Sequence, residues 1–381
     1  MPTQTATRVP RLGAPARRMP VPAAHSRGWT VAWRDAALAV LVARLVSWGA
    51  AAWGHGDPFA AATQRWDAQH LHGIAVGGYP DQLREAWAFW PGYPVLVAAF
   101  GGSWTVGVLV SLLCSVAALA LLRRLAEEEL GAGAARRAVW LVALFPAAWA
   151  FGSFYTESLF LLETVGAVYA ARRGRWALAG LAGAAAALTR NTGVLLVLAL
   201  GWEAWRQRAA WRAAWLALVP AAPFTFLAVA QIQAGDWLAP AHVGRIWGRG
   251  WHGPLAAVPE AFDQAREALA GTLPASFEPA WMVVGQLALV LGAGVALVGV
   301  LRRLPLGWGL YAGAALAVPL SEPWPEHPLM SVPRYLAVLF PLHLWLAART
   351  GRRAVLVVAL AVSVAGLALL SARFGGWQWA G

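Results

Sequence analysis

The sequence predicts an all-α, polytopic membrane protein of about eleven transmembrane helices. Of its 381 residues, 59% are hydrophobic and only 13% are charged, whereas a soluble domain carries roughly a quarter charged residues. Apolar stretches of about 18 residues or more recur along the chain, and this is the length that crosses a bilayer as a helix. The stretches are continuous and lack two-residue alternation, which favours helices over a β-barrel.

The expected spans follow one another from residue 35 to residue 371. The middle ones are the shortest, since a full crossing takes about twenty residues. The expected spans are 35–54, 103–122, 137–151, 155–171, 176–190, 192–205, 211–231, 281–301, 305–320, 334–348 and 353–371.

The positions of the arginines predict the orientation in the membrane. With the N-terminus in the cytoplasm, 21 of the 30 arginines fall on the cytoplasmic side, 8 fall on the other side, and Arg44 lies within the first span. Such a bias is typical of cytoplasmic loops. Membrane topology therefore accounts for most of the net charge of +12, and we expect no nucleic-acid partner.

The same threading divides the chain into a membrane domain and two tails. Residues 1–34 hold five prolines and several arginines without an apolar core, which predicts a disordered cytoplasmic tail. The membrane domain covers residues 35–371, and residues 372–381 form a short extracytoplasmic tail. Two long connections, residues 55–102 and 232–280, are expected on the extracytoplasmic face.

The first long connection contains the polar stretch "RWDAQH". Asp67 follows Trp66, and His70 shares its face if the stretch is helical. A carboxylate at the edge of the membrane could act as a general base toward a hydroxyl, or it could simply cap a short interfacial helix. His70 and His72 form an H-x-H pair, but no third nearby ligand completes a metal site, and we expect no metal.

Aromatic residues follow in "AWAFWPGYP", which includes Trp90 and Tyr93. Such rings can pack on the apolar face of a sugar or on a prenyl chain. An interfacial aromatic belt with turns fixed by proline explains the rings equally well.

Three further charged residues lie at expected span ends on the extracytoplasmic side: Glu157 in "FYTES", Arg190 in "ALTRNTG" and Arg334 in "SVPRY". Carboxylates at such boundaries are costly and often functional, although Glu157 could also serve as a helix N-terminal charge. The two arginines suit a lipid-linked phosphate by charge and geometry. Snorkelling to ordinary headgroups is the alternative for each.

In order along the chain, "RWDAQH…GGYP", "FWPGYPVL", "SFYTESLFLL", "ALTRNTG" and "PRYLAVLFPL" resemble the motifs of the PIG-V-like mannosyltransferase family. This family consists of integral-membrane glycosyltransferases of the GT-C superfamily. The matches extend over residues 60 to 345. They depart from the family at Ala68, where a serine is expected after the tryptophan-aspartate pair.

The resemblance implies an inverting transfer of a hexose, in particular mannose, from a polyprenyl-phosphate sugar to a lipid-linked or glycan acceptor. The reaction would take place on the extracytoplasmic face of the cell membrane and need no cofactor. Asp67 would be the catalytic base, and Arg190 and Arg334 would bind the donor phosphate. Substrate-binding roles are implied for Trp66, His70, Trp90, Tyr93, Glu157 and Tyr335.

A transporter or flippase of lipid-linked saccharides is the main alternative from another functional class. It would use the same phosphate-binding arginines, but it predicts polar residues at mid-membrane and an inverted repeat. The polar residues here gather on one side and no repeat is evident, which favours the enzyme.

Overall fold

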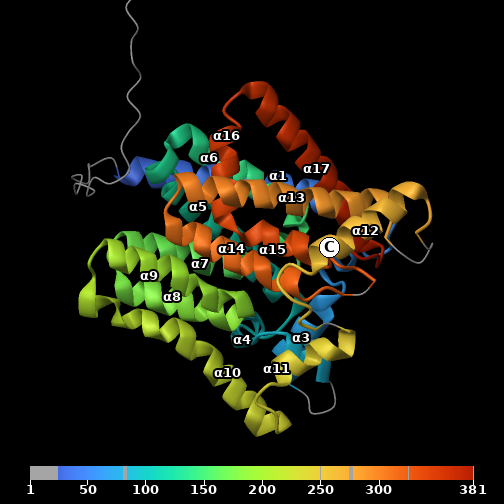
Figure 1. The fold of residues 1–381 in the computed structure, drawn as a ribbon, viewed down its shortest axis with the longest axis horizontal. Coiled ribbons are helices and arrows are strands. Elements are labelled where there is room, and N and C mark those ends of the chain that lie inside the picture. The colour runs from blue at the N-terminus through green and yellow to red at the C-terminus, as the bar shows by residue number, and fades with distance from the viewer. Residues whose placement is uncertain (1–24, 80–83, 249, 274–277, 325, 381) are drawn as a thin grey trace, which may run out of the picture.

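The computed structural model describes residues 25–79, 84–248, 250–273, 278–324 and 326–380. Within these ranges the chain is helical, and its only β-type pairing is an isolated bridge between Trp324 and His327. The predicted all-α fold is confirmed (Figure 1). The tail expected over residues 1–34 lies outside the described residues as far as residue 24, while residues 25–34 belong to the first helix.

Among the residues that the structure describes, five helical segments are long and apolar enough to cross a bilayer, which makes the chain a multi-pass membrane protein. They are α1 (His25–Ala52), α5 (Trp104–Leu130), η4 (Ala210–Ala217) running into α10 (Leu218–Ala234), α13 (Ala280–Arg303) and α17 (Arg353–Gly375).

The other expected spans coincide with shorter helices or with pairs of consecutive helices. The shorter helices are α6 (Ala132–Ala143) followed by η2 (Ala148–Gly152), α7 (Glu157–Arg172), α8 (Trp176–Thr189), η3 (Asn191–Leu195) followed by α9 (Leu196–Arg206), α14 (Leu306–Ser321), and α15 (Val332–Val338) followed by α16 (Phe340–Arg349).

The two long connections are themselves helical. The first contains α2 (Pro58–Thr63), α3 (Asp67–Gly77), η1 (Arg84–Ala88) and α4 (Gly92–Ala99), and the second contains α11 (Ala239–His242), η5 (Val243–Trp247) and α12 (Ala257–Ala270). Helix α12 packs on α13 and α14, while α11 packs on α10 and η1.

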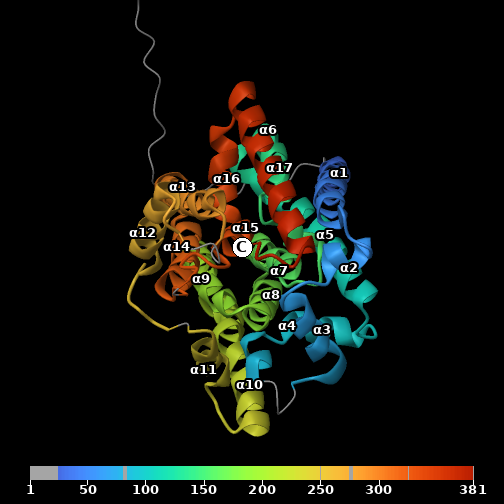
Figure 2. The ribbon, with the colours of Figure 1, turned by 90° about the vertical axis from the view of Figure 1, so that its right-hand side faces the viewer.

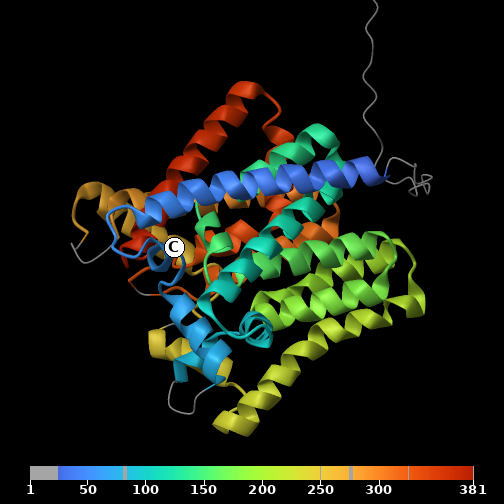
Figure 3. The same cartoon turned by 180° about the vertical axis from the view of Figure 1, so that it is seen from behind.

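The helices pack in two adjoining rows. One row runs α17, α1, α5, α7, α8 and α10 in spatial order, and the other runs α6, α16, α13, α14 and α9. Figure 3 shows α1 crossing the back of the molecule above α5, α7 and α8, and α10 along the lower edge. Contacts between α5 and α6 and between α7 and α9 join the rows.

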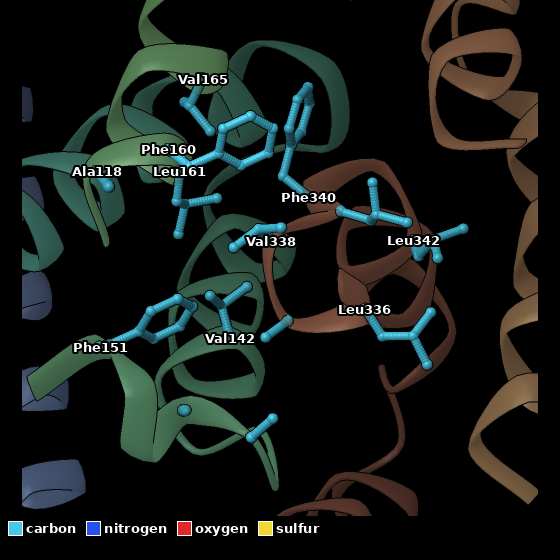
Figure 4. Close-up of a cluster of buried hydrophobic side chains, with 14 of the residues drawn as sticks. Ala118, Val142, Phe151, Phe160, Leu161, Val165, Leu336, Val338, Phe340 and Leu342 are labelled. Carbon is cyan, nitrogen blue, oxygen red and sulfur yellow. The ribbon is translucent and has the colours of Figure 1, made fainter. Parts of the chain in front are cut away.

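Helix α7 lies at the centre of this arrangement. Figure 4 shows Phe160, Leu161 and Val165 of α7 facing Val338 and Phe340 of the α15–α16 segment. The five side chains are buried in one hydrophobic cluster, so the N-terminal half of α7 and the junction between α15 and α16 are held close together.

Arg44, the one arginine expected inside a span, is buried in α1 and donates to two backbone carbonyls of η2. Its Nη2 lies 2.5 Å from Ala148 O and its Nη1 lies 3.1 Å from Trp149 O. The carbonyls partly compensate the buried charge, and the contact fixes η2 immediately before the segment that leads into α7.

Candidate active site

Four of the charged residues singled out in the sequence form one connected cluster. Arg334 Nη1 lies 2.7 Å from Asp67 Oδ2 and 3.7 Å from Glu157 Oε1. Arg190 Nη1 lies 2.7 Å from the same Glu157 oxygen. Asp67, Arg334, Glu157 and Arg190 are therefore linked in a chain of alternating charge whose formal charges sum to zero.

Each member of the cluster is placed at the end of a helix. Asp67 and Glu157 are the first residues of α3 and α7, where a carboxylate faces the positive end of the helix dipole. Arg334 lies in the first turn of α15. Arg190 has an extended backbone and separates α8 from η3.

Close backbone packing positions Arg190. The amide of Gly193 donates to Arg190 O at 2.8 Å. A Cβ atom at Gly193 would lie 2.1 Å from Ala186 O and 2.3 Å from its carbonyl carbon. Only glycine fits against the last turn of α8 here, and this packing turns the chain sharply just after Arg190.

Two of the helix starts follow a residue with positive φ. Trp66, directly before Asp67, has φ 55° and ψ −123°. Ser331, which precedes α15, has φ 66° and ψ −7°. For residues other than glycine such backbone costs roughly 1–3 kcal/mol and persists only where the surroundings hold it. The strain lies beside the two members of the 2.7 Å ion pair.

The cluster is mostly shielded from solvent. The side chain of Glu157 is 0% exposed, those of Arg334 and Arg190 are 9% and 10% exposed, and that of Asp67 is 25% exposed. Buried charges are tolerated where they are paired and hydrogen-bonded. Asp67 is the member most accessible to a bound molecule.

Two tyrosines frame the arginines. The Arg334 guanidinium carbon lies 5.1 Å from the Tyr155 ring centroid, and that of Arg190 lies 4.6 Å from the Tyr335 ring centroid, which is within cation–π range. The Tyr155 hydroxyl donates to Arg65 O at 3.2 Å. The rings restrict the arginines without using up their N–H groups.

Arg334 retains an unused donor. Its Nη2 donates to Ser331 Oγ at 3.3 Å and its Nη1 contacts the carboxylates. Its buried Nε has no hydrogen-bond partner in the part of the chain that the structure describes. A buried N–H without an acceptor is costly, so this side of the guanidinium suits one more anionic oxygen.

The structure does not bring every residue of the expected site together. His70 stacks on Phe89 with ring centroids 5.0 Å apart, and Trp90 packs against Phe226 of α10 at 5.1 Å. Tyr93 is fully buried, and its hydroxyl contacts Gly107 O at 2.8 Å and Ser111 Oγ at 3.0 Å. Their substrate-binding roles stay predictions, and for Tyr93 the surroundings are those of a packing residue.

Sequence reasoning missed several neighbours of the cluster. Tyr155 and Thr156 lie in the same "FYTES" motif as Glu157, and Thr156 Oγ1 lies 3.2 Å from Arg190 Nη1. The motif could have indicated both. Trp377 and Trp379, which pack on Trp66, follow the last helix and carry no sequence signal.

Among the described residues there is no group of three or more histidine, cysteine, aspartate or glutamate side chains that could hold a metal ion. His72, the second member of the H-x-H pair, stacks on Trp104 with ring centroids 3.9 Å apart. Its packing is that of an aromatic residue.

No family model and no curated protein matches the chain. Among solved structures, it is similar to ArnT from Cupriavidus metallidurans, crystallised with undecaprenyl phosphate bound, at 17% identity and a TM-score of 0.49. The match covers 85% of this chain and 60% of the ArnT chain, so the chain spans less than two thirds of that protein's length.

Proposed function

We propose that the protein is a GT-C-type membrane glycosyltransferase that moves a hexose, mannose in particular, from a polyprenyl-phosphate sugar to a hydroxyl of a lipid-linked or glycan acceptor. The observation that carries the proposal is the cluster in which Arg334 contacts both Asp67 and Glu157, with Arg190 on the other side of Glu157. A carboxylate beside two arginines is what a transfer from phosphate to a hydroxyl requires. The choice of mannose as the transferred sugar rests on the resemblance of the sequence motifs.

The reaction is a single displacement. The acceptor oxygen attacks the anomeric carbon as the bond from that carbon to the phosphate oxygen breaks, and the electron pair leaves with the polyprenyl phosphate. The acceptor proton passes to Asp67, the most exposed carboxylate of the cluster. No covalent enzyme intermediate forms, so one well-placed base suffices and the anomeric configuration inverts.

The arginines act where negative charge develops. The donor is a phosphodiester with one negative charge, and the leaving polyprenyl phosphate gains a second. Arg334 offers its unpartnered Nε to a phosphate oxygen, and Arg190 lies on the far side of Glu157 at 2.7 Å. Fixed cations in a water-poor site stabilise such a charge far better than water does.

Binding of the donor would also prepare the base. In the structure, Arg334 Nη1 is engaged by Asp67 at 2.7 Å. A phosphate that draws the guanidinium toward itself would weaken this ion pair and leave the Asp67 oxygen available to an acceptor hydroxyl. Glu157 keeps both arginines in place throughout, since it contacts each of them.

The test is a transfer assay in proteoliposomes with radiolabelled polyprenyl-phosphate mannose and membrane acceptor lipids. Wild type should transfer label, and Asp67→Asn should lose about 10²–10⁴-fold of the rate, the usual contribution of a general base. Asp263→Asn, an exposed aspartate on α12, is the matched control and should keep full activity. Equal rates for wild type and Asp67→Asn would reject Asp67 as the base.

A second outcome would reject the enzyme class. If no label is transferred but the donor moves between leaflets, the protein is a transporter or flippase of lipid-linked saccharides and not a transferase. Labelled polyprenyl-phosphate glucose serves as a second donor, so that transfer of another hexose is distinguished from the absence of transfer.

A further inference from the structure

The segment that follows α17, Gly376–Ala380, packs against the residue directly before Asp67. The ring centroids of Trp379 and Trp66 are 5.4 Å apart at an interplanar angle of 82°, and those of Trp377 and Trp66 are 6.0 Å apart at 62°. We call this segment the C-terminal clasp. Figure 2 shows the end of α17, from which the clasp continues, beside α2 and the end of α1.

The last residue of α17 and the clasp together hold Arg65, the next residue back along the chain. Arg65 Nε donates to Gly375 O at 3.2 Å, and its guanidinium carbon lies 4.8 Å from the Trp377 ring centroid. The Arg65 carbonyl accepts the 3.2 Å hydrogen bond from Tyr155. Both residues before Asp67 are thus fixed by partners outside their own connection.

The clasp itself is firmly attached. A Cβ atom at Gly375 would lie 2.0 Å from Ala51 O, so the end of α17 is in close backbone contact with the end of α1. Arg373 Nε donates to Trp379 O at 2.9 Å, and its Nη1 donates to Gln378 Oε1 at 3.2 Å. The position of the Trp379 ring is therefore set by the transmembrane helix and not by the clasp alone.

Trp66 needs such support. Its backbone, at φ 55° and ψ −123°, lies outside the regions that a residue with a side chain favours. It is the N-cap of α3, so its conformation determines where the helix starts and where the Asp67 carboxylate projects. Strained residues keep their conformation only when their surroundings impose it. For Trp66, Trp377 and Trp379 of the clasp supply aromatic packing of this kind.

We infer that Trp377 and Trp379 are positioning residues for Asp67, acting through Trp66. They touch no reacting atom. Their packing keeps α3 starting at Asp67 and holds its carboxylate at the 2.7 Å contact with Arg334. This inference rests on the proposed function for its catalytic consequence, whereas its structural part stands on the packing alone.

The experiment combines hydrogen exchange with steady-state kinetics in the same proteoliposomes. Trp379→Ala should speed amide exchange in the peptides that cover residues 61–70 and leave the exchange of α8 unchanged. With polyprenyl-phosphate mannose as donor, its kcat should fall by about 10- to 100-fold, the cost of a displaced catalytic group. The KM for the donor should stay within about twofold, because the arginines are untouched. Trp379→Phe should restore most of the rate, since an aromatic ring is retained.

The control is Trp211→Ala, an exposed tryptophan in η4, which should change neither readout. Unchanged exchange over residues 61–70 in Trp379→Ala overturns the clasp, whatever the transfer assay gives. Faster exchange over residues 61–70 with an unaltered kcat in Trp379→Ala would show that the clasp does not position Asp67 for catalysis. If wild type transfers no sugar from any donor, the proposed function fails, and the exchange data still decide the structural part of the inference.

Discussion

Arg334 Nη1 lies 2.7 Å from Asp67 Oδ2, so the residue proposed to bind the donor phosphate is ion-paired with the residue proposed to act as base. The two come from helices α15 and α3, which are far apart in the sequence. Each lies in the first turn of its helix, after a residue with positive φ. The relationship links phosphate binding to the availability of the base, because one guanidinium serves both.

The geometry of the Arg334 guanidinium predicts that lysine cannot replace it. Its nitrogens engage Asp67, Ser331 and, at 3.7 Å, Glu157, and a single ammonium group cannot reproduce this fork. Arg334→Lys should lower kcat/KM for the donor by about 10- to 100-fold, as expected for the loss of a charged hydrogen bond worth roughly 1.5–3 kcal/mol. Steady-state transfer kinetics measure it, and Arg266→Lys, on the exposed face of α12, is the control. A lysine variant with wild-type kinetics would remove Arg334 from the phosphate site.

Glu157 should be essential for stability as well as for activity. Its fully buried carboxylate is shared by Arg190 and Arg334, and breaking a buried pair leaves uncompensated charge at a cost of about 3–5 kcal/mol. Glu157→Gln should therefore lower the thermal midpoint in detergent markedly. Glu322→Gln, on an exposed carboxylate, should leave the midpoint unchanged. An unaltered midpoint for Glu157→Gln would contradict the ion-pair network described here.

Gly193 should tolerate no side chain. A Cβ atom there would meet the backbone of Ala186 at 2.1 Å, so Gly193→Ala must push η3 away from α8 and displace Arg190 between them. Overpacking of this kind costs about 1–3 kcal/mol, and the transfer rate should fall with it. Gly166→Ala in α7 is the matched control, because its nearest neighbour is a Leu121 methyl at 4.0 Å. Equal thermal stability of the two variants would show that α8 and η3 are less tightly packed.

The connection before α13 should make stability depend on pH. Burial raises the pKa of Glu278 to about 7, against opposing effects of Arg373 and Gln286. His327 Nδ1 faces the carboxylate at 3.7 Å, and burial lowers the pKa of His327. Since the folded-state pKa of Glu278 exceeds the ordinary value of 4.5, ionisation disfavours the folded state. This penalty is absent below about pH 4.5, grows as the pH rises toward 7 and is constant above it.

Glu278→Gln should therefore stabilise the protein at pH 8 by up to roughly 3 kcal/mol and have little effect at pH 4.5. Thermal unfolding at the two pH values measures the difference. Glu260→Gln, on the exposed side of α12, provides the comparison at both. A gain of the same size at both pH values would mean that the charge of Glu278 is not the cause.

Much of the fold could be predicted from the sequence because the bilayer imposes a length and a composition on each span. All eleven expected segments coincide with helices, although four of them, 137–151, 192–205, 211–231 and 334–348, are each divided between two consecutive helices. Of the helices inside the two long connections, only a short one beside Asp67 was considered from the sequence, as one alternative for that stretch. Segments such as α3 and α12 are short and are held in place by tertiary packing rather than by a long apolar pattern.

For the site, the sequence indicated which residues to consider but not how they pair. Asp67, Glu157, Arg190 and Arg334 were distinguished by charge at the ends of apolar segments, and the structure brings all four together. That Arg334 contacts both carboxylates depends on how α3, α7 and α15 meet. Trp377 and Trp379 could not be foreseen, because a tryptophan after the last span is equally typical of an interfacial belt.

A structure in nanodiscs with polyprenyl phosphate added would show directly whether Arg190 and Arg334 bind a lipid-linked phosphate. We expect the phosphate within hydrogen-bond distance of Arg334 Nε, on the side of Arg190, with the Asp67–Arg334 contact longer than 2.7 Å. A phosphate bound elsewhere, for example at Arg302 and Arg303 in the last turn of α13, with the cluster unchanged, would show that Arg190 and Arg334 do not form the phosphate site.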